Sequence, residues 1–139
     1  MSQEIAVVLD DTALRAYVAG QVAVGELIAE VADENRQVGI PAACLAAAYA
    51  ATATDEVGTA LLALLMTTPA VRLLPLGVEP GADDVRQTGR FALAAGGDLA
   101  TGHAILSALA NQAHYATTKP HPAAAVLPAR WGVIDLSEA

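Results

Sequence analysis

Acidic and hydroxyl side chains occur in this sequence where strands of a parallel sheet would end and helices would begin. They are Asp10, Asp11 and Thr12 after a first apolar run, Asp98 and Thr101 at the start of a helix, and Thr117, Thr118 and Lys119 after a fourth strand. Ligands of open parallel sheets bind beyond the carboxyl ends of the strands, beside helix N-termini. We therefore expect these positions to meet in one ligand-binding cleft.

No other pattern of reactive side chains in the sequence competes with this cleft. His114 and His121 have no partner at metal-ligand spacing, so no zinc site is predicted. Cys44 has no base beside it and His103 lies among small residues, which favours a core role for both. The sequence contains neither a phosphate-binding glycine loop nor a Ser-His-Asp signature.

Short apolar runs that alternate with helical patterns predict the fold class. The runs favour strands at residues 5–9, 38–40, 71–76, 114–117 and 132–136. Pro75 marks the end of the third strand or an edge of the sheet. Strands separated by helices imply an α/β protein, a three-layer α/β/α sandwich with a central parallel sheet. We expect one domain over residues 1–139.

Apolar residues at helical period and acids at helix starts predict the helices that position these strands. We expect Asp11 to cap the first helix, over residues 12–19, and either Thr54 or Asp55 to cap a later one. Asp98 is the expected cap of the last long helix. Residues 120–128 are rich in proline and are predicted to be a connection.

Composition narrows the class of protein without indicating a function. The net charge of −8 argues against holding nucleic acid by bulk charge, and the 55% hydrophobic content excludes a disordered chain. The longest uncharged stretches contain polar residues, so we expect buried helices and no membrane span. A single cysteine, Cys44, favours a cytoplasmic location. Six arginines against one lysine, with much alanine, are typical of a GC-rich bacterial genome.

Four segments together resemble the PIN domain, the fold of many toxin–antitoxin ribonucleases. They are VVLDDTAL at 7–14, PAACLAAAY at 41–49, GDLATGHA at 97–104 and ATTKP at 116–120. The likeness extends over residues 4–136, and the order and spacing of the segments carry it. By resemblance, the fold is PIN-like and the activity is Mg²⁺- or Mn²⁺-dependent hydrolysis of single-stranded RNA. That chemistry needs several carboxylates in one cleft.

The chain departs from the family at the acidic positions. Asp10 keeps the first acid, Ala47 replaces the second, and Lys119 replaces the fourth. The third falls on Thr101 at the strictest spacing, or on Asp98 one helical turn earlier. The two replacements make the cleft three charges more positive than the family pattern, and each charge is worth about 1–4 kcal/mol near a metal. We expect Lys119 to pair with Asp10 where the family would hold a metal.

Three functions follow from the resemblance and these departures. The first is a nuclease-derived protein, with catalysis weak or lost and no cofactor, that binds RNA, a nucleotide or a protein. The second is an active Mg²⁺- or Mn²⁺-dependent RNA endonuclease, the toxin of a toxin–antitoxin pair, that uses Asp10, Asp11 and Asp98. The third is an interaction module held by an antitoxin-like protein. Residues 57–66 and 24–35 would supply the face of a homodimer.

Overall fold

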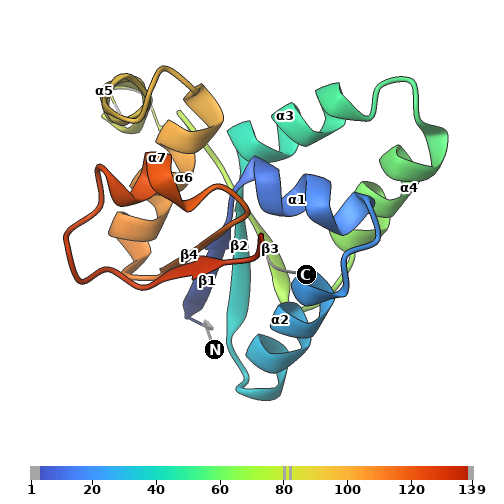
Figure 1. Cartoon of the computed structure of the whole chain (residues 1–139). Helices are drawn as coiled ribbons and strands as arrows, with labels where there is room; N and C mark the ends of the chain where they lie inside the picture. Colours follow the sequence, from blue (N-terminus) through green and yellow to red (C-terminus); the bar gives the residue numbers. More distant parts are fainter. Residues whose placement is uncertain (1–3, 80, 82, 138–139) are drawn as a thin grey trace.

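The computed structural model describes residues 4–79, 81 and 83–137, and a parallel sheet lies at its centre (Figure 1). The strands are β1 (Ile5–Leu9), β2 (Gln37–Pro41), β3 (Val71–Leu74), β4 (His114–Thr117) and β5 (Val133–Asp135). Their order is β3-β2-β1-β4-β5, and each neighbouring pair is parallel. All five residues of β1 are buried, because helices cover both faces of this central strand.

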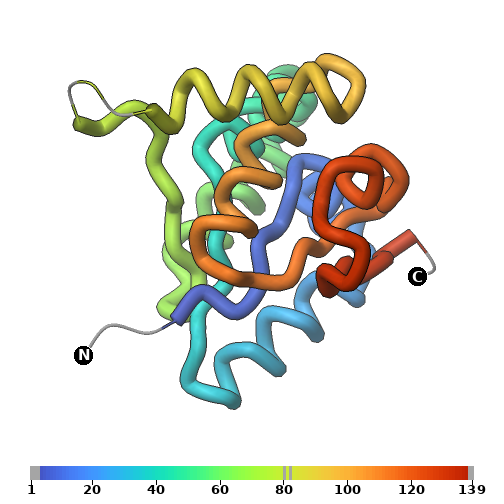
Figure 2. The backbone as a smooth tube through the Cα atoms, turned by 90° about the vertical axis from the view of Figure 1, so that its left-hand side faces the viewer, coloured from blue at the N-terminus to red at the C-terminus, as the bar shows by residue number. Residues whose placement is uncertain are grey.

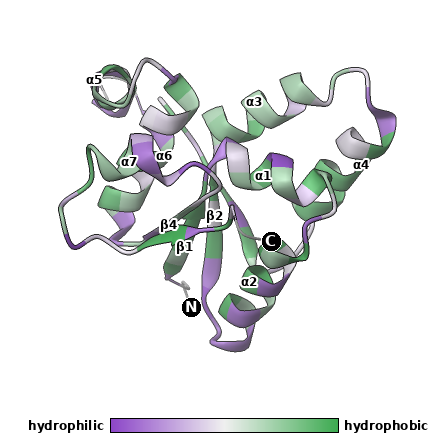
Figure 3. Ribbon diagram, viewed as in Figure 1, coloured by the Kyte–Doolittle hydropathy of each residue, from purple (hydrophilic) through white to green (hydrophobic). Residues whose placement is uncertain are grey.

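Helices form a layer on each side of the sheet, so the predicted three-layer α/β/α sandwich is confirmed (Figure 1). They are α1 (Asp11–Val18), α2 (Val22–Asp33), α3 (Ala42–Ala51), α4 (Glu56–Leu65), α5 (Asp84–Ala94), α6 (Leu99–Asn111) and α7 (Pro120–Ala124). The first four lie on one side and the last three on the other. Figure 3 shows hydrophobic strands between the layers. No helix of the described residues is long and apolar enough to cross a membrane.

The strand order places the predicted cleft at a reversal of direction in the sheet. From β1 the chain moves outward through β2 to the edge strand β3, and then returns over the sheet through α5 and α6 to β4. Leu9 at the end of β1 pairs with Ala116 near the end of β4. The residues that follow these two strands therefore lie side by side, where open α/β sheets bind ligands.

The structure corrects the sequence predictions at two places near this cleft. Asp10, and not Asp11, caps α1, because its carboxylate accepts a hydrogen bond from the backbone N–H of Ala13. The connection 120–128 contains the short helix α7, which begins at Pro120. A proline in the first helical turn lacks only an N–H that would have no partner there, so it starts a helix without cost.

Elsewhere the predicted elements agree with the structure, with differences at their ends. Asp55 is the residue that caps α4, and it accepts from the N–H of Gly58 at 3.0 Å. Strand β3 ends at Leu74, directly before Pro75, and lies at the edge of the sheet as that proline predicted. Asp98 caps α6 through the N–H of Ala100, also at 3.0 Å.

Helix α5 packs over the first turns of α6 by a close approach of the two backbones (Figure 2). Gly102 of α6 permits this, since a Cβ atom there would meet the Thr88 carbonyl oxygen and would lie 2.7 Å from the Ala92 nitrogen. Because Asp98 caps α6, this contact also positions one wall of the cleft.

We predict that Gly102→Ala lowers the free energy of unfolding by about 1–3 kcal/mol, because the added methyl group forces α5 away from α6. The matched control is Gly89→Ala on α5, where a Cβ meets nothing within 4 Å. That change should raise stability by about 0.5–1 kcal/mol through helix propensity. Urea unfolding measures both. Equal effects of the two substitutions would contradict the close approach.

Candidate functional site

Asp10 lies at the end of β1, with 2% of its surface exposed, and both of its carboxylate oxygens accept hydrogen bonds. Oδ1 accepts from the hydroxyl of Thr12 at 2.6 Å and from the N–H of Ala13 at 3.0 Å. Oδ2 accepts from the hydroxyl of Tyr115 at 3.1 Å. Three donors thus stabilise a nearly buried carboxylate, which would otherwise be costly to remove from water.

Tyr115 is the buried partner that sequence inspection missed. It lies in β4 beside β1, its side chain is fully buried, and its register partner in β1 is Val8. Burial, and then the negative charge of Asp10, raise the pKa of the Tyr115 hydroxyl far above its ordinary value. The hydroxyl therefore stays protonated and remains a donor to Asp10.

A chain of hydroxyl groups ties the start of α1 to the segment after β4. The Thr12 hydroxyl donates to Asp10 and accepts from the N–H of Thr118 at 2.9 Å. The Thr117 hydroxyl lies 3.0 Å from that of Thr12 and accepts from the N–H of Lys119 at 3.0 Å. Since the one proton of Thr12 is used toward Asp10, Thr117 donates to Thr12. This network fixes the backbone of Lys119 relative to Asp10.

A pocket of about 210 Å³ brings together most of the predicted site residues. Asp10, Thr12, Asp98, Thr101 and Lys119 all line it. Thr101 donates from its hydroxyl to Asp98 Oδ2 at 3.1 Å, so the two alternatives for the third acidic position lie in the same wall. Thr117 stands behind this surface, fully buried.

Lys119 lies in the pocket, but the expected ion pair with Asp10 is not formed. Among the described residues, no pair of opposite charges within 4.0 Å includes Lys119. Asp10 instead receives the hydroxyl and backbone donors named above. The side chain of Lys119 is exposed, and its ammonium group faces the pocket and solvent.

Asp11 does not line the pocket, and 6% of its surface is exposed. Its Oδ2 accepts from the Arg15 guanidinium at 3.2 Å, whereas Oδ1 is buried with no hydrogen-bond partner. Burial, followed by the charges of Asp10 and Asp98, raises the pKa of Asp11, and Arg15 offsets part of this rise. The Asp11 carboxylate is therefore close enough to Asp10 and Asp98 to be repelled by both.

Other residues named from the sequence lie in the core, as their surroundings predicted. Cys44 is fully buried and donates from its thiol to the Ala100 carbonyl oxygen, and burial raises its pKa. His103 Nδ1 accepts from the Ala43 N–H at 3.2 Å, and burial lowers the pKa of this imidazole. Ala47, at the second acidic position of the family pattern, is half-buried against the core and does not line the pocket.

Comparisons with known proteins identify similar folds only among solved structures. No family model matches the sequence, and no curated protein does. PAE2754 from Pyrobaculum aerophilum matches with a TM-score of 0.63 and 16% identity, over 96% of this chain and 90% of that one. The structure of VapBC2 from Rickettsia felis bound to a DNA fragment of its promoter matches with a TM-score of 0.60 and 12% identity. This match covers 83% of the present chain and 89% of the other.

The strand order, the two helical layers and these matches define a class of fold, an α/β/α sandwich with its cleft beside the central strand. Within that class the chain has a PIN-like fold, as the resemblance of its four segments predicted. Structural matches at 16% and 12% sequence identity show the fold alone. The chemistry has to be argued from the residues of the cleft.

We predict that Tyr115→Phe lowers the free energy of unfolding by about 1–3 kcal/mol, because it leaves a buried carboxylate one donor short. Tyr17→Phe is the matched control, since the half-buried Tyr17 hydroxyl makes no hydrogen bond to a described residue. Urea unfolding at neutral pH distinguishes the two variants. Equal stability of both would show that the Tyr115–Asp10 contact contributes nothing.

The burial of Asp11 predicts a stability difference that depends on pH. Because its folded-state pKa lies above the ordinary 3.8, its favourable contribution is complete below that value and is lost as the pH rises through the folded-state pKa. We therefore expect Asp11→Asn to gain stability relative to the wild type as the pH rises from about 4 to 7. Urea unfolding across this range measures the difference. If Asp11→Asn instead lost stability relative to the wild type over this range, the ion pair with Arg15 would outweigh the cost of burying the Asp11 charge.

Proposed function

We propose that this protein is a nuclease-derived, PIN-like protein that binds single-stranded RNA or nucleotide phosphates in its cleft, with catalysis weak or lost. The observation that carries this proposal is the position of Lys119, which lines the same pocket as Asp10 and Asp98. An ammonium group attracts a phosphate and repels a divalent cation. The cleft would thus bind the backbone of a nucleic acid directly, without a metal between them.

The donor set of the cleft is a poor match for Mg²⁺ or Mn²⁺. Asp10 and Asp98 are the only carboxylates that line the pocket, and hydroxyl or backbone donors already engage the oxygens of both. Among the described residues, no three His, Cys, Asp or Glu side chains are grouped to hold an ion. Mg²⁺ gives up its water reluctantly, so two engaged carboxylates beside an ammonium group are a weak site.

A second function, the active endonuclease, has one observation in its favour. Asp10, Asp11 and Asp98 are close enough to raise the pKa of Asp11, and a divalent ion would relieve that repulsion. Asp11 would have to leave Arg15 and turn toward the pocket to bind the ion. In this alternative, Asp10 and Asp98 are the catalytic metal ligands and Mg²⁺ or Mn²⁺ is the cofactor.

An antitoxin-like protein partner and a homodimer are further parts of the proposal. The match to VapBC2 supports a toxin–antitoxin association. Helix α4 exposes Val57 and Leu64, at 71% and 63%, and Val22 at the start of α2 is 70% exposed. Apolar side chains this exposed favour contact with another chain.

Binding of Mn²⁺, measured by calorimetry, tests the loss of the metal site. We expect no binding to the wild type at millimolar Mn²⁺, and binding to Lys119→Asp, which restores the fourth acid. The two-unit change of charge is worth at least about 2 kcal/mol, or roughly 30-fold in affinity. Arg90→Asp, the same change on the exposed face of α5, is the control and should gain nothing.

Binding of a fluorescent single-stranded RNA should change in the opposite direction. We expect the wild type to bind it and Lys119→Asp to lose this binding, while Arg90→Asp retains more of it. If instead the wild type binds Mn²⁺ and Asp10→Asn abolishes this binding, the endonuclease reading replaces the proposal. Cleavage of the same RNA in Mn²⁺, absent in Asp10→Asn, would then be the expected result.

A further inference from the structure

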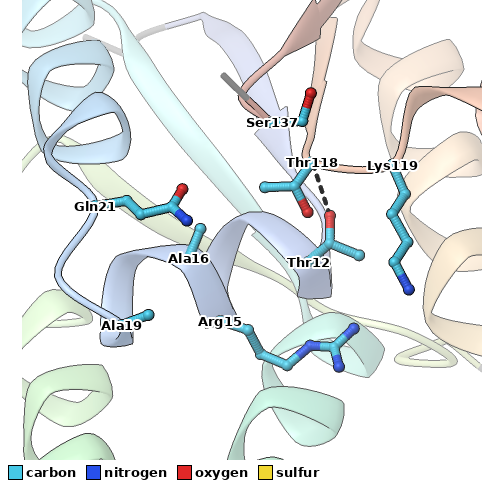
Figure 4. Close-up of a pocket in the computed structure, with 8 residues that line it drawn as sticks. All are labelled: Thr12, Arg15, Ala16, Ala19, Gln21, Thr118, Lys119 and Ser137. Atoms are coloured by element: carbon cyan, nitrogen blue, oxygen red, sulfur yellow. Dashed lines mark hydrogen bonds between the residues drawn. The ribbon is translucent and has the colours of Figure 1, made fainter. Parts of the chain in front are cut away.

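A second pocket, of about 360 Å³, adjoins the cleft and shares Thr12, Arg15 and Lys119 with it (Figure 4). The carboxylates Asp10 and Asp98 belong to the first pocket alone. The second pocket continues past the start of α1 toward the turn before α2 and the segment after β5. The two pockets together form one groove whose middle is the pair Arg15 and Lys119.

One end of the second pocket is positively charged. Figure 4 shows the side chains of Arg15 and Lys119 extending to the same side, from α1 and from the segment after β4. Arg15 uses one N–H group toward Asp11, which leaves other guanidinium donors free for a ligand. Among the described residues, no carboxylate lines this pocket, although the whole chain has a net charge of −8. Although Arg15 also contacts Asp11, two cations in a pocket lined by no described carboxylate fit a phosphate group.

The other end of the pocket is apolar with two polar groups above it. Ala16 of α1 and Ala19, which directly follows this helix, form an apolar wall, and Gln21 points into the space beside them (Figure 4). The Gln21 Oε1 atom is buried without a hydrogen-bond partner, so the amide gains by turning toward a donor on a ligand. The Ser137 hydroxyl donates to Asp135 and keeps its acceptor capacity.

We propose that this pocket is a nucleotide subsite. The phosphate lies between Arg15 and Lys119, the base lies against Ala16 and Ala19, and Gln21 and Ser137 hydrogen-bond the edge of the base. This inference rests on the proposed function, to which it adds recognition of one base beside the bound phosphate. A volume of about 360 Å³ is within the range of small-molecule sites. Because no aromatic side chain lines the pocket, the base is recognised by its edge and not by stacking.

Calorimetry with adenosine 5′-monophosphate and ribose 5-phosphate separates the base from the phosphate. We expect the wild type to bind the nucleotide about 10-fold more tightly, since only the nucleotide reaches Gln21 and Ser137. Ala19→Phe fills the base end and should reduce the affinity for the nucleotide to that for ribose 5-phosphate. Ala29→Phe, at an exposed alanine of α2 outside the pocket, is its control and should preserve the difference.

The phosphate end is tested with Lys119→Gln, which should weaken both compounds by about 10-fold through loss of one charge-assisted contact. Arg90→Gln, on α5, is the control for net charge and should change neither affinity appreciably. Gln21→Leu should remove most of the preference for the nucleotide while retaining the binding of ribose 5-phosphate. These results together would support the subsite.

The opposing outcomes distinguish failure of the subsite from failure of the proposed function. Equal affinity for the two compounds, with both weakened by Lys119→Gln, would overturn the base subsite and leave RNA binding by phosphate intact. Binding of a fluorescent single-stranded RNA without binding of either small compound would also overturn it. If the protein binds neither the RNA nor the compounds, the proposed function itself is wrong, and the subsite fails with it.

Discussion

The buried carboxylate of Asp10 is the interaction on which the rest of the cleft depends. It ends the central strand, caps α1, and accepts hydrogen bonds from Tyr115 of the neighbouring strand. Through Thr12 it also fixes the segment after β4. A carboxylate with 2% exposure is stable only when hydrogen-bond donors surround it. The sheet, helix α1 and the segment after β4 must therefore all be in position before the Asp10 carboxylate is fully hydrogen-bonded.

The proposed choice of ligand follows from the charges around Asp10. Two carboxylates lie on one side of Thr12, the cations Arg15 and Lys119 lie in the middle, and neutral polar groups lie on the other side. A divalent ion would need the two carboxylates without the two cations, whereas the proposed nucleotide would use the cations and the neutral polar groups. For charges about 4 Å apart, Coulomb energies of about 1–4 kcal/mol are large enough to decide between the two ligands.

The fold followed from the sequence because its strands are short apolar runs bounded by clear breaks. Residues 114–117 were predicted to be a strand with the ends that the structure shows. The site was only partly predictable. Asp10, Asp98 and Lys119 stand at helix starts and strand ends, which topology brings together. Tyr115 and Arg15 carry no local signal, since their roles depend on which strand lies beside β1 and on which way Asp11 turns.

Asp10 and Asp98, the two acids that line the cleft, both stabilise the fold. Asp10 caps α1 and Asp98 caps α6, and loss of such a cap costs about 1 kcal/mol whether or not a metal binds. The two positions that lack an acid have no such role: Ala47 lies within α3, and the side chain of Lys119 makes no ion pair among the described residues. The carboxylates present are thus the ones that the fold itself requires. A PIN-like chain that binds no metal would therefore keep these carboxylates, just as an active nuclease would. The residue that distinguishes the two possibilities is Lys119.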